Sequence, residues 1–166
     1  MKNYYRIMLG RGSEHAAACF EGNFIGADFG VHQDLTGKLP DNWPAFNKEF
    51  IPIFLDQHPA KSRVAAGLAC GAVWTVSKGI AVGEVVLCPD GLGSYRVGEL
   101  TGEYAYAAGE LLPHRRPVRW LDQAIRREEM STSLQNSTGS IGTHCMITKY
   151  AHEIEQLLGD VQLSTL

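Results

Sequence analysis

Short runs of branched and aromatic residues, separated by glycine and polar turns, predict several β-strands along the chain. Tyr4–Leu9 and Phe24–Gly30 are the first two, and Val85–Cys88 is apolar on both faces, as expected of a central strand. Pro89-Asp90-Gly91 is a turn sequence, so residues 94–100 are expected to return as the second strand of a hairpin. Residues 115–121 predict a further strand, and Pro113 and Pro117 favour an edge position for it.

Helical spacing of apolar residues predicts helices between these strands. Ser13 is a candidate N-cap for a short first helix, and Pro44 suits the start of a second, which Pro52 is expected to disturb. Ser62 to Lys78 predicts a longer helix rich in small residues that permit close packing, ended by Gly79. The remaining helices are expected over residues 122–134 and in the stripe Ile147, Ala151, Ile154 and Leu158.

This order of elements predicts an α+β fold, a mostly antiparallel sheet or small β-barrel flanked by helices. The alternation of strand and helix typical of a nucleotide-binding sheet is absent from the pattern. We expect one domain over residues 1–158 and a tail, or a truncated linker to an effector domain, over residues 159–166.

Composition narrows the class of protein. The chain has 166 residues, 45% of them apolar, and a net charge of −3, which is typical of a globular protein and unlike one that coats nucleic acid. No apolar run approaches a membrane span, and the four cysteines stand far apart, so a reducing cytoplasm and no membrane are expected. Residues 61–127 hold 9 basic and 6 acidic side chains, so a contact with a polyanion is expected there.

Motifs for catalysis are weak. The six histidines form no HxH or HExxH pattern, and no GxSxG elbow or Walker loop is present. Asp90 is better explained as a turn residue than as a metal ligand. We therefore expect no catalytic residue, no metal and no cofactor.

Aromatic and basic residues give a more specific signal. Phe29, Trp43 and Trp74 fall in or beside predicted loops and helix ends, where they either pack in the core or stack on bases. On a straight helix, Trp74 lies about 160° from the stripe of Leu68, Ala72 and Val76. In residues 114–120, arginines are interleaved with an aromatic residue, as in a strand that contacts phosphates, although a solvated edge strand is the alternative. Alternation places Arg115 and Arg119 on one face and Arg116 on the other.

The segments YYRIMLGRGSEHAAACFEGNFIGADFG, RVAAGLACGAVWTVSKGIAVGEVVLCPDGLGSYRVGELTGEY and LLPHRRPVRWL resemble a known class of domain. They are similar to the N-terminal specificity domains of modification-dependent (type IV, Mrr-like) restriction enzymes, which are related to the EVE and YTH branches of the PUA-like superfamily. The resemblance covers about residues 3–158. It implies a PUA-like barrel that reads a modified, methylated or hydroxymethylated, base of double-stranded DNA for phage defence, often with a nuclease domain in the same chain.

The resemblance also implies a site. Such domains rotate a base out of the duplex and enclose it in an aromatic pocket, here expected from Asp28, Phe29, Trp43 and Trp74, with Asp90 as a weaker candidate. Asp28 is expected to accept from the exocyclic amine of the base. The cations expected at the nucleic-acid backbone are Arg11, Lys61, Arg63, Lys78, Arg115, Arg116 and Arg119.

Three other functions stay open at the level of sequence. The first is a YTH-like reader of modified RNA, the second an enzyme that acts on a nucleotide or small ligand without a metal, and the third a protein-interaction domain. Competition between modified RNA and modified DNA separates the first from the DNA reader, turnover identifies the second, and failure to bind nucleic acid identifies the third.

Overall fold

A computed structural model describes residues 2–159 and shows two compact units. Unit 1 comprises residues 2–24, 81–102 and 117–159, and unit 2 comprises residues 25–80 and 103–116. The predicted tail lies outside the described residues, apart from Gly159. The chain passes from one unit to the other within two strands, β2 (Phe24–Ala27) and β6 (His114–Arg126).

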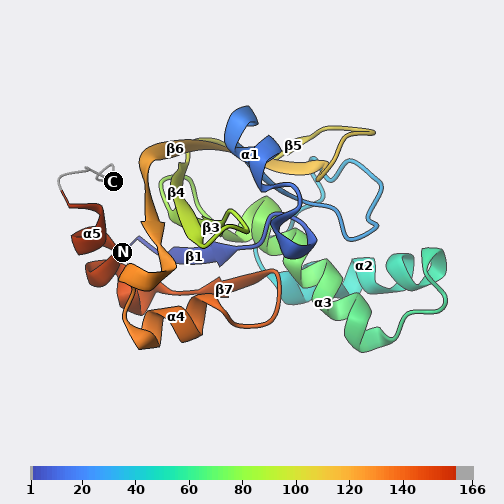
Figure 1. The fold of residues 1–166 in the computed structure, drawn as a ribbon. Helices are drawn as coiled ribbons and strands as arrows, with labels where there is room; N and C mark the ends of the chain where they lie inside the picture. The colour runs from blue at the N-terminus through green and yellow to red at the C-terminus, as the bar shows by residue number, and fades with distance from the viewer. Residues whose placement is uncertain (1, 160–166) are drawn as a thin grey trace. The chain divides into compact units, whose positions relative to one another are not determined.

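Unit 1 contains most of a mixed sheet (Figure 1). The strand order is β2-β6-β4-β3-β1-β7, and β5 pairs with the first residues of β6. β1 and β3 pair in parallel, with Tyr4 opposite Val85, and the other registered pairs are antiparallel. The sheet is strongly curled into a half-barrel, so the predicted α+β class with a partial, mostly antiparallel barrel is confirmed. The strands of unit 1 are β1 (Tyr4–Ile7), β3 (Val85–Pro89), β4 (Ser94–Leu100), the later part of β6, and β7 (His144–Met146).

Short helices accompany this sheet in unit 1. They are η1 (Arg11–Ser13), α1 (Ala16–Gly22), η3 (Arg127–Glu129), α4 (Thr132–Thr138), η4 (Thr148–Tyr150) and α5 (Ala151–Leu158). The last two α-helices cover an aliphatic cluster that includes Val85, Leu87, Val97, Leu134 and Ile154, all buried. Burial of such side chains contributes about 1.5–3 kcal/mol each, so this cluster anchors the sheet.

Unit 2 is built around a pair of helices, α2 (Trp43–Gln57) and α3 (Arg63–Trp74). Phe46, Phe50 and Phe54 are buried at helical spacing on α2, and the rings of Phe46 and Phe50 stack at 4.4 Å. Gly67 of α3 lies against Ile51 and Asn47 of α2. Asn47 donates from Nδ2 to the carbonyl of Gly67 at 3.2 Å, which requires close packing of the two helices. Unit 2 also holds η2 (Thr75–Gly79, a π-helical turn) and β5 (Ala105–Tyr106).

The structure confirms several predicted elements. Ser62 caps α3 by accepting from the N–H of Ala65 at 3.1 Å, and Val85–Pro89 and Ser94–Leu100 form the predicted hairpin. Helix α2 continues through Pro52, contrary to the expected disturbance, because the carbonyl that loses its donor belongs to exposed Lys48 and can bond to water.

Other predictions are wrong. Residues 122–126 continue β6 instead of beginning a helix, because Arg126 pairs with Ser94 and Ile125 with Tyr95 across the sheet. β6 is an interior strand between β2 and β4, not an edge. Ser13 has a positive φ of 63° inside a 3₁₀ turn and does not cap α1, whose N-cap is His15. The predicted loop over residues 136–140 is in part helical, since α4 runs to Thr138.

Candidate functional site

Trp43 is the most exposed of the predicted aromatic residues. It is the first residue of α2 and its side chain is 55% exposed. Asn42 fixes this helix start by accepting from the N–H of Ala45 at 2.9 Å, and Pro44 follows in the first turn. The local sequence therefore holds the backbone of Trp43 firmly while leaving its indole largely in water, which is costly for so large an apolar surface.

Trp74 lies at the same end of the helix pair. It ends α3, and its indole Nε1–H donates to the carbonyl of Pro40 at 2.8 Å, three residues before Trp43. Its ring also lies against Gly79, where an added Cβ would come within 2.7 Å of the indole Cζ3. The ring is half-buried and fixed on two sides, and exposed Lys78 precedes Gly79. The two tryptophans and one lysine thus belong to one end of the α2–α3 pair, which we call the tryptophan end.

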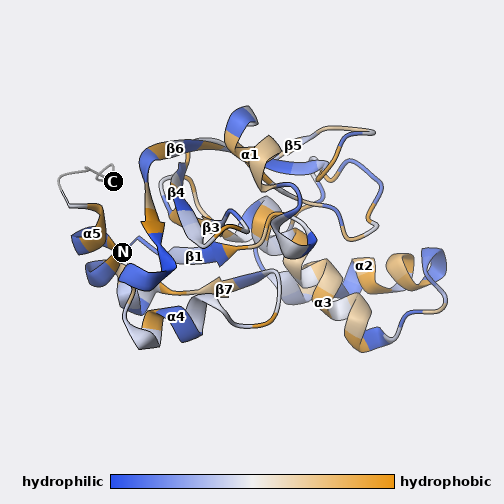
Figure 2. Cartoon of the chain, in the orientation of Figure 1, coloured by the Kyte–Doolittle hydropathy of each residue, from blue (hydrophilic) through white to orange (hydrophobic). Residues whose placement is uncertain are grey.

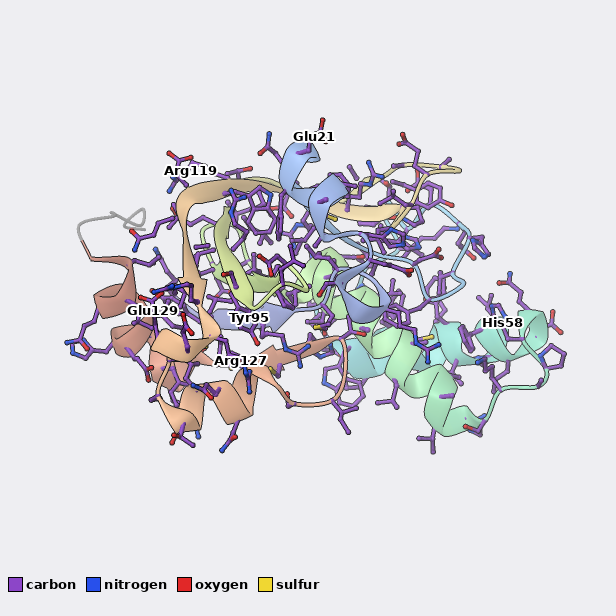
Figure 3. All side chains as sticks on the ribbon, in the orientation of Figure 1. Glu21, His58, Tyr95, Arg119, Arg127 and Glu129 are labelled. Atoms are coloured by element: carbon purple, nitrogen blue, oxygen red, sulfur yellow. The ribbon has the colours of Figure 1, made fainter. Side chains whose placement is uncertain are left out.

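Asp28 and Phe29 lie at the opposite end of α2. Phe29 is 39% exposed with a φ of 50°, and Asp28 accepts from the N–H of Gly30 at 3.2 Å. The Gly30 carbonyl bonds at 3.1 Å to Nε2 of His58, the residue after α2, which Figure 3 labels. A helix of 15 residues is about 22 Å long, so the structure does not bring Phe29 and Asp28 together with the tryptophan end.

Asp90 lies in unit 1 and performs the turn role that its sequence predicts. Its Oδ1 accepts from the N–H of Leu92 at 2.6 Å and from that of Ser94 at 3.1 Å. This carboxylate closes the β3–β4 turn, which accounts for its position without a ligand.

The predicted cations of β6 are engaged within the protein. Arg116 is only 1% exposed and its Nη1 donates to the carbonyl of Ile80 at 2.6 Å, with longer bonds to Val76 and Ser77. The prediction that Arg116 contacts a nucleic-acid backbone is therefore wrong. The predicted alternation along β6 does hold, and it turns Arg116 toward the interior. Arg115 donates to the carbonyls of Leu111 and Leu112.

Arg119, which Figure 3 labels, is half-exposed in unit 1. Its guanidinium is paired with the carboxylate of Glu99, a residue that is 2% exposed. The other predicted backbone cations are all exposed, and none of them forms an ion pair within residues 2–159. They are Arg11 in unit 1, and Lys61, Arg63 and Lys78 in unit 2. Lys61 lies in the α2–α3 connection and Arg63 begins α3, where Figure 2 shows hydrophilic residues at the tip of the helix pair.

Sequence reasoning missed His114, which is fully buried in unit 2. Its Nε2 bonds to the carbonyl of Val31 at 2.6 Å and its Nδ1 to the hydroxyl of Tyr104 at 2.8 Å, while that hydroxyl accepts from the N–H of Leu35. Burial lowers the pKa of His114 from its ordinary value, which favours the neutral ring that holds the loop following Phe29. The bonded groups lie far apart in sequence, so no local sequence pattern predicts this network.

The described part of the chain offers no obvious metal centre. Among residues 2–159, no group of three or more histidine, cysteine or acidic side chains is arranged to hold a metal ion. Within the same range, no helix combines the length and the apolar character that crossing a membrane requires.

Comparison with known families gives one match. The model of a family described as a domain of unknown function, DUF8426, matches residues 5–143, and the chain therefore belongs to this family. No curated protein matches the chain.

Proposed function

We propose that this member of the DUF8426 family binds double-stranded DNA and recognises a modified base that is rotated out of the duplex. The observation that carries the proposal is the tryptophan end of unit 2, where Trp43 is 55% exposed, Trp74 is half-buried, and Lys78 is exposed. The resemblance to EVE and YTH domains favours this chemistry, and the curled half-barrel is compatible with a PUA-like relationship.

Energetics favour a stacked base at this end. Rotation of a base out of a duplex costs a few kcal/mol, and stacking on an aromatic side chain returns about 1–3 kcal/mol. Two tryptophans can therefore offset most of the cost. A buried methyl group adds only about 0.8 kcal/mol, so selectivity for a modification requires polar contacts as well. In this proposal Trp43 supplies stacking and Lys78 holds a neighbouring phosphate.

The other end of α2 contacts the same duplex in this proposal. Lys61 and Arg63 are exposed there without an ion pair within residues 2–159, and Phe29 lies nearby through the contact of Gly30 with His58. The length of α2 corresponds to roughly six nucleotides at 3.4 Å per step. In this arrangement Phe29 and Asp28 contact the strand beyond the rotated base. The effector we propose is a nuclease domain, either in the same protein or in a partner.

Binding of matched duplexes by Trp43→Ala and Leu68→Ala tests the proposal. Leu68 is 73% exposed on α3 of the same helix pair, so its variant matches the loss of exposed apolar surface. Fluorescence anisotropy is measured with duplexes that differ at one base, carrying cytosine, methylcytosine, hydroxymethylcytosine or methyladenine. We expect Trp43→Ala to weaken binding of the preferred duplex by about 5- to 100-fold, and Leu68→Ala to change it less than twofold.

Unchanged affinity and unchanged preference in folded Trp43→Ala would contradict the proposal. A modified RNA that displaces the preferred DNA at lower concentration would replace it with the YTH-like RNA reader. Binding to none of the duplexes or RNAs would leave the protein-interaction alternative.

A further inference from the structure

Unit 1 contains a cavity that the proposed function does not use. Its volume is about 480 Å³, within the range of roughly 300–1,000 Å³ typical of small-molecule sites. It lies between the β3–β4 turn, the end of β6 and helix α4, and two of its lining residues are joined by a hydrogen bond from the backbone N–H of Arg127 to the carbonyl of Gly93 at 2.9 Å. Its lining residues are Leu92, Gly93, Ser94, Arg126, Arg127, Glu128 and Gln135.

Arg127 lines this cavity with a guanidinium that stands outside the ion-pair cluster of Arg126, Glu128 and Glu129. Its Nη1 donates to the hydroxyl of Tyr95 at 3.4 Å and to the carbonyl of Gln135 at 3.2 Å, and both acceptors are neutral. No acidic side chain within residues 2–159 forms an ion pair with Arg127, whereas the adjacent Arg126 pairs with Glu128 at 3.1 Å and with Glu129 at 3.3 Å. A half-buried guanidinium without a counterion attracts an anion from solution.

The guanidinium of Arg127 is held in place before any ligand arrives. Figure 3 labels Tyr95 and Arg127 close together. Gly139 lies against the group, since an added Cβ there would be 3.6 Å from both Nη atoms. The side-chain amide of Gln135 donates to the carbonyls of Arg127 and Met130, each at 3.1 Å. A preorganised planar group loses little entropy when it binds. Because Nη1 donates to Tyr95 and Gln135, the edge of Nε–H and Nη2 is the one that matches two oxygens of a phosphate.

Residues at the rim of the cavity indicate which chemical groups of the ligand lie next to its anionic group. Leu92 is 90% exposed at the tip of the turn and provides an apolar contact, while the hydroxyl of Ser94 provides a neutral donor. We propose that this cavity binds the phosphate group of a nucleotide, with Arg127 on the phosphate and Leu92 against the base or sugar. The site goes beyond the proposed function and does not depend on Trp43.

Titration of the whole chain with inorganic phosphate, adenosine 5′-monophosphate and adenosine, followed by NMR, tests the site. We expect phosphate and the monophosphate to shift the Arg127 Nε–Hε and the Gly93 amide signals, and adenosine to leave them in place. Absence of shifts with millimolar phosphate and monophosphate, or equal shifts with adenosine, would overturn the proposal. Oligonucleotides with and without a 5′-phosphate then tell a terminal phosphate from one inside a strand.

Substitutions at the rim test the electrostatics without touching the fold. Because the side chain of Leu92 is 90% exposed, Leu92→Lys and Leu92→Glu are both expected to fold. A unit charge placed about 8 Å from the phosphate in water changes affinity by about twofold to threefold. Inorganic phosphate has no base or sugar to contact Leu92, so Lys should tighten its binding and Glu should weaken it. Changes in the same direction for both variants would count against an anion site.

Arg127→Gln and Arg126→Gln form the second pair of variants. We expect Arg127→Gln to weaken binding of the monophosphate at least tenfold, and Arg126→Gln, whose native charge is already paired, to stay within twofold of the native protein. Denaturant unfolding of both variants identifies any that fail to fold, in which case the Leu92 pair decides. Trp43→Ala is expected to leave the phosphate titration unchanged, so failure of the cavity and failure of the tryptophan end are distinguishable.

Discussion

Within residues 2–159, each compact unit buries one arginine, Arg6 in unit 1 and Arg116 in unit 2. Arg6 donates to the carbonyls of Ser140 and Gly142 in a loop, and Arg116 donates to carbonyls of the η2 turn and of Ile80. The two units differ in how much of a tryptophan side chain is exposed. Trp120 in unit 1 is 9% exposed and its indole donates to the carbonyl of Cys19, whereas Trp43 in unit 2 is 55% exposed. Similar internal bonding therefore supports two kinds of surface, one with a cavity around Arg127 and one with tryptophan available for stacking.

Substitution of the buried arginines should have the largest effect on the free energy of unfolding of the two units. Arg116→Met keeps most of the side-chain volume but leaves the carbonyl of Ile80 without its donor, so we expect a loss of about 3 kcal/mol or more in the free energy of unfolding. Arg6→Met should cost a similar amount in unit 1, where Arg6 holds the carbonyls of Ser140 and Gly142. Hydrogen exchange locates the loss in one unit or the other.

Arg63→Gln is the matched control, because Arg63 is exposed at the start of α3 and should change stability by less than about 0.5 kcal/mol. A free energy of unfolding for Arg116→Met that lies within about 1 kcal/mol of the native value would show that the buried guanidinium is not needed to hold the η2 turn.

Acid should destabilise unit 2 through His114, a smaller effect. Burial lowers the pKa of His114 below 6.5 in the folded chain, so the unfolded chain binds a proton that the folded chain does not. Stability is therefore unaffected above pH 6.5 by this group and falls as the pH drops below 6.5, until the lowered pKa is reached. The amide exchange of Val31 and Leu35 should accelerate over this range.

His114→Gln should remove the acid-dependent part of that acceleration, while His32→Gln, which alters a side chain that is 67% exposed, should retain it. A similar pH dependence in native protein and His114→Gln would assign the effect to another group. His144 in unit 1 is also a candidate for acid sensitivity, since burial and Arg6 lower its pKa, and exchange in β7 reports it separately.

Local chemistry was enough to predict the elements whose signals are local. The Pro89-Asp90-Gly91 turn predicts its hairpin because Asp90 supplies the acceptors for the turn itself, and Ser62 predicts the start of α3 in the same way. The strand β7 was missed because His144–Met146 is only three residues long and exists through pairing with β1, far away in sequence. Residues 122–126 were assigned to a helix because their pairing with β4 is equally non-local.

The candidate site was predictable in its residue types and less so in its arrangement. Exposure of Trp43 and Phe29 agrees with their predicted place in or beside loops and helix ends, but the length of α2 separates them. Alternation along β6 correctly put Arg116 on the face opposite Arg119, yet the sequence does not say which face is internal. The cavity around Arg127 depends on α4, which runs from Thr132 to Thr138, whereas the sequence predicted a helix over residues 122–134.

Whether the tryptophan end recognises the base is tested by following the three indole N–H signals of the native protein by NMR during titration with the preferred modified duplex. We expect Trp43 to shift most and Trp74 less, because its N–H stays bonded to Pro40, while the signal of buried Trp120 remains in place. An unmoved Trp43 signal at saturation with duplex, or a shift confined to Trp120, would contradict the assignment of base recognition to the tryptophan end.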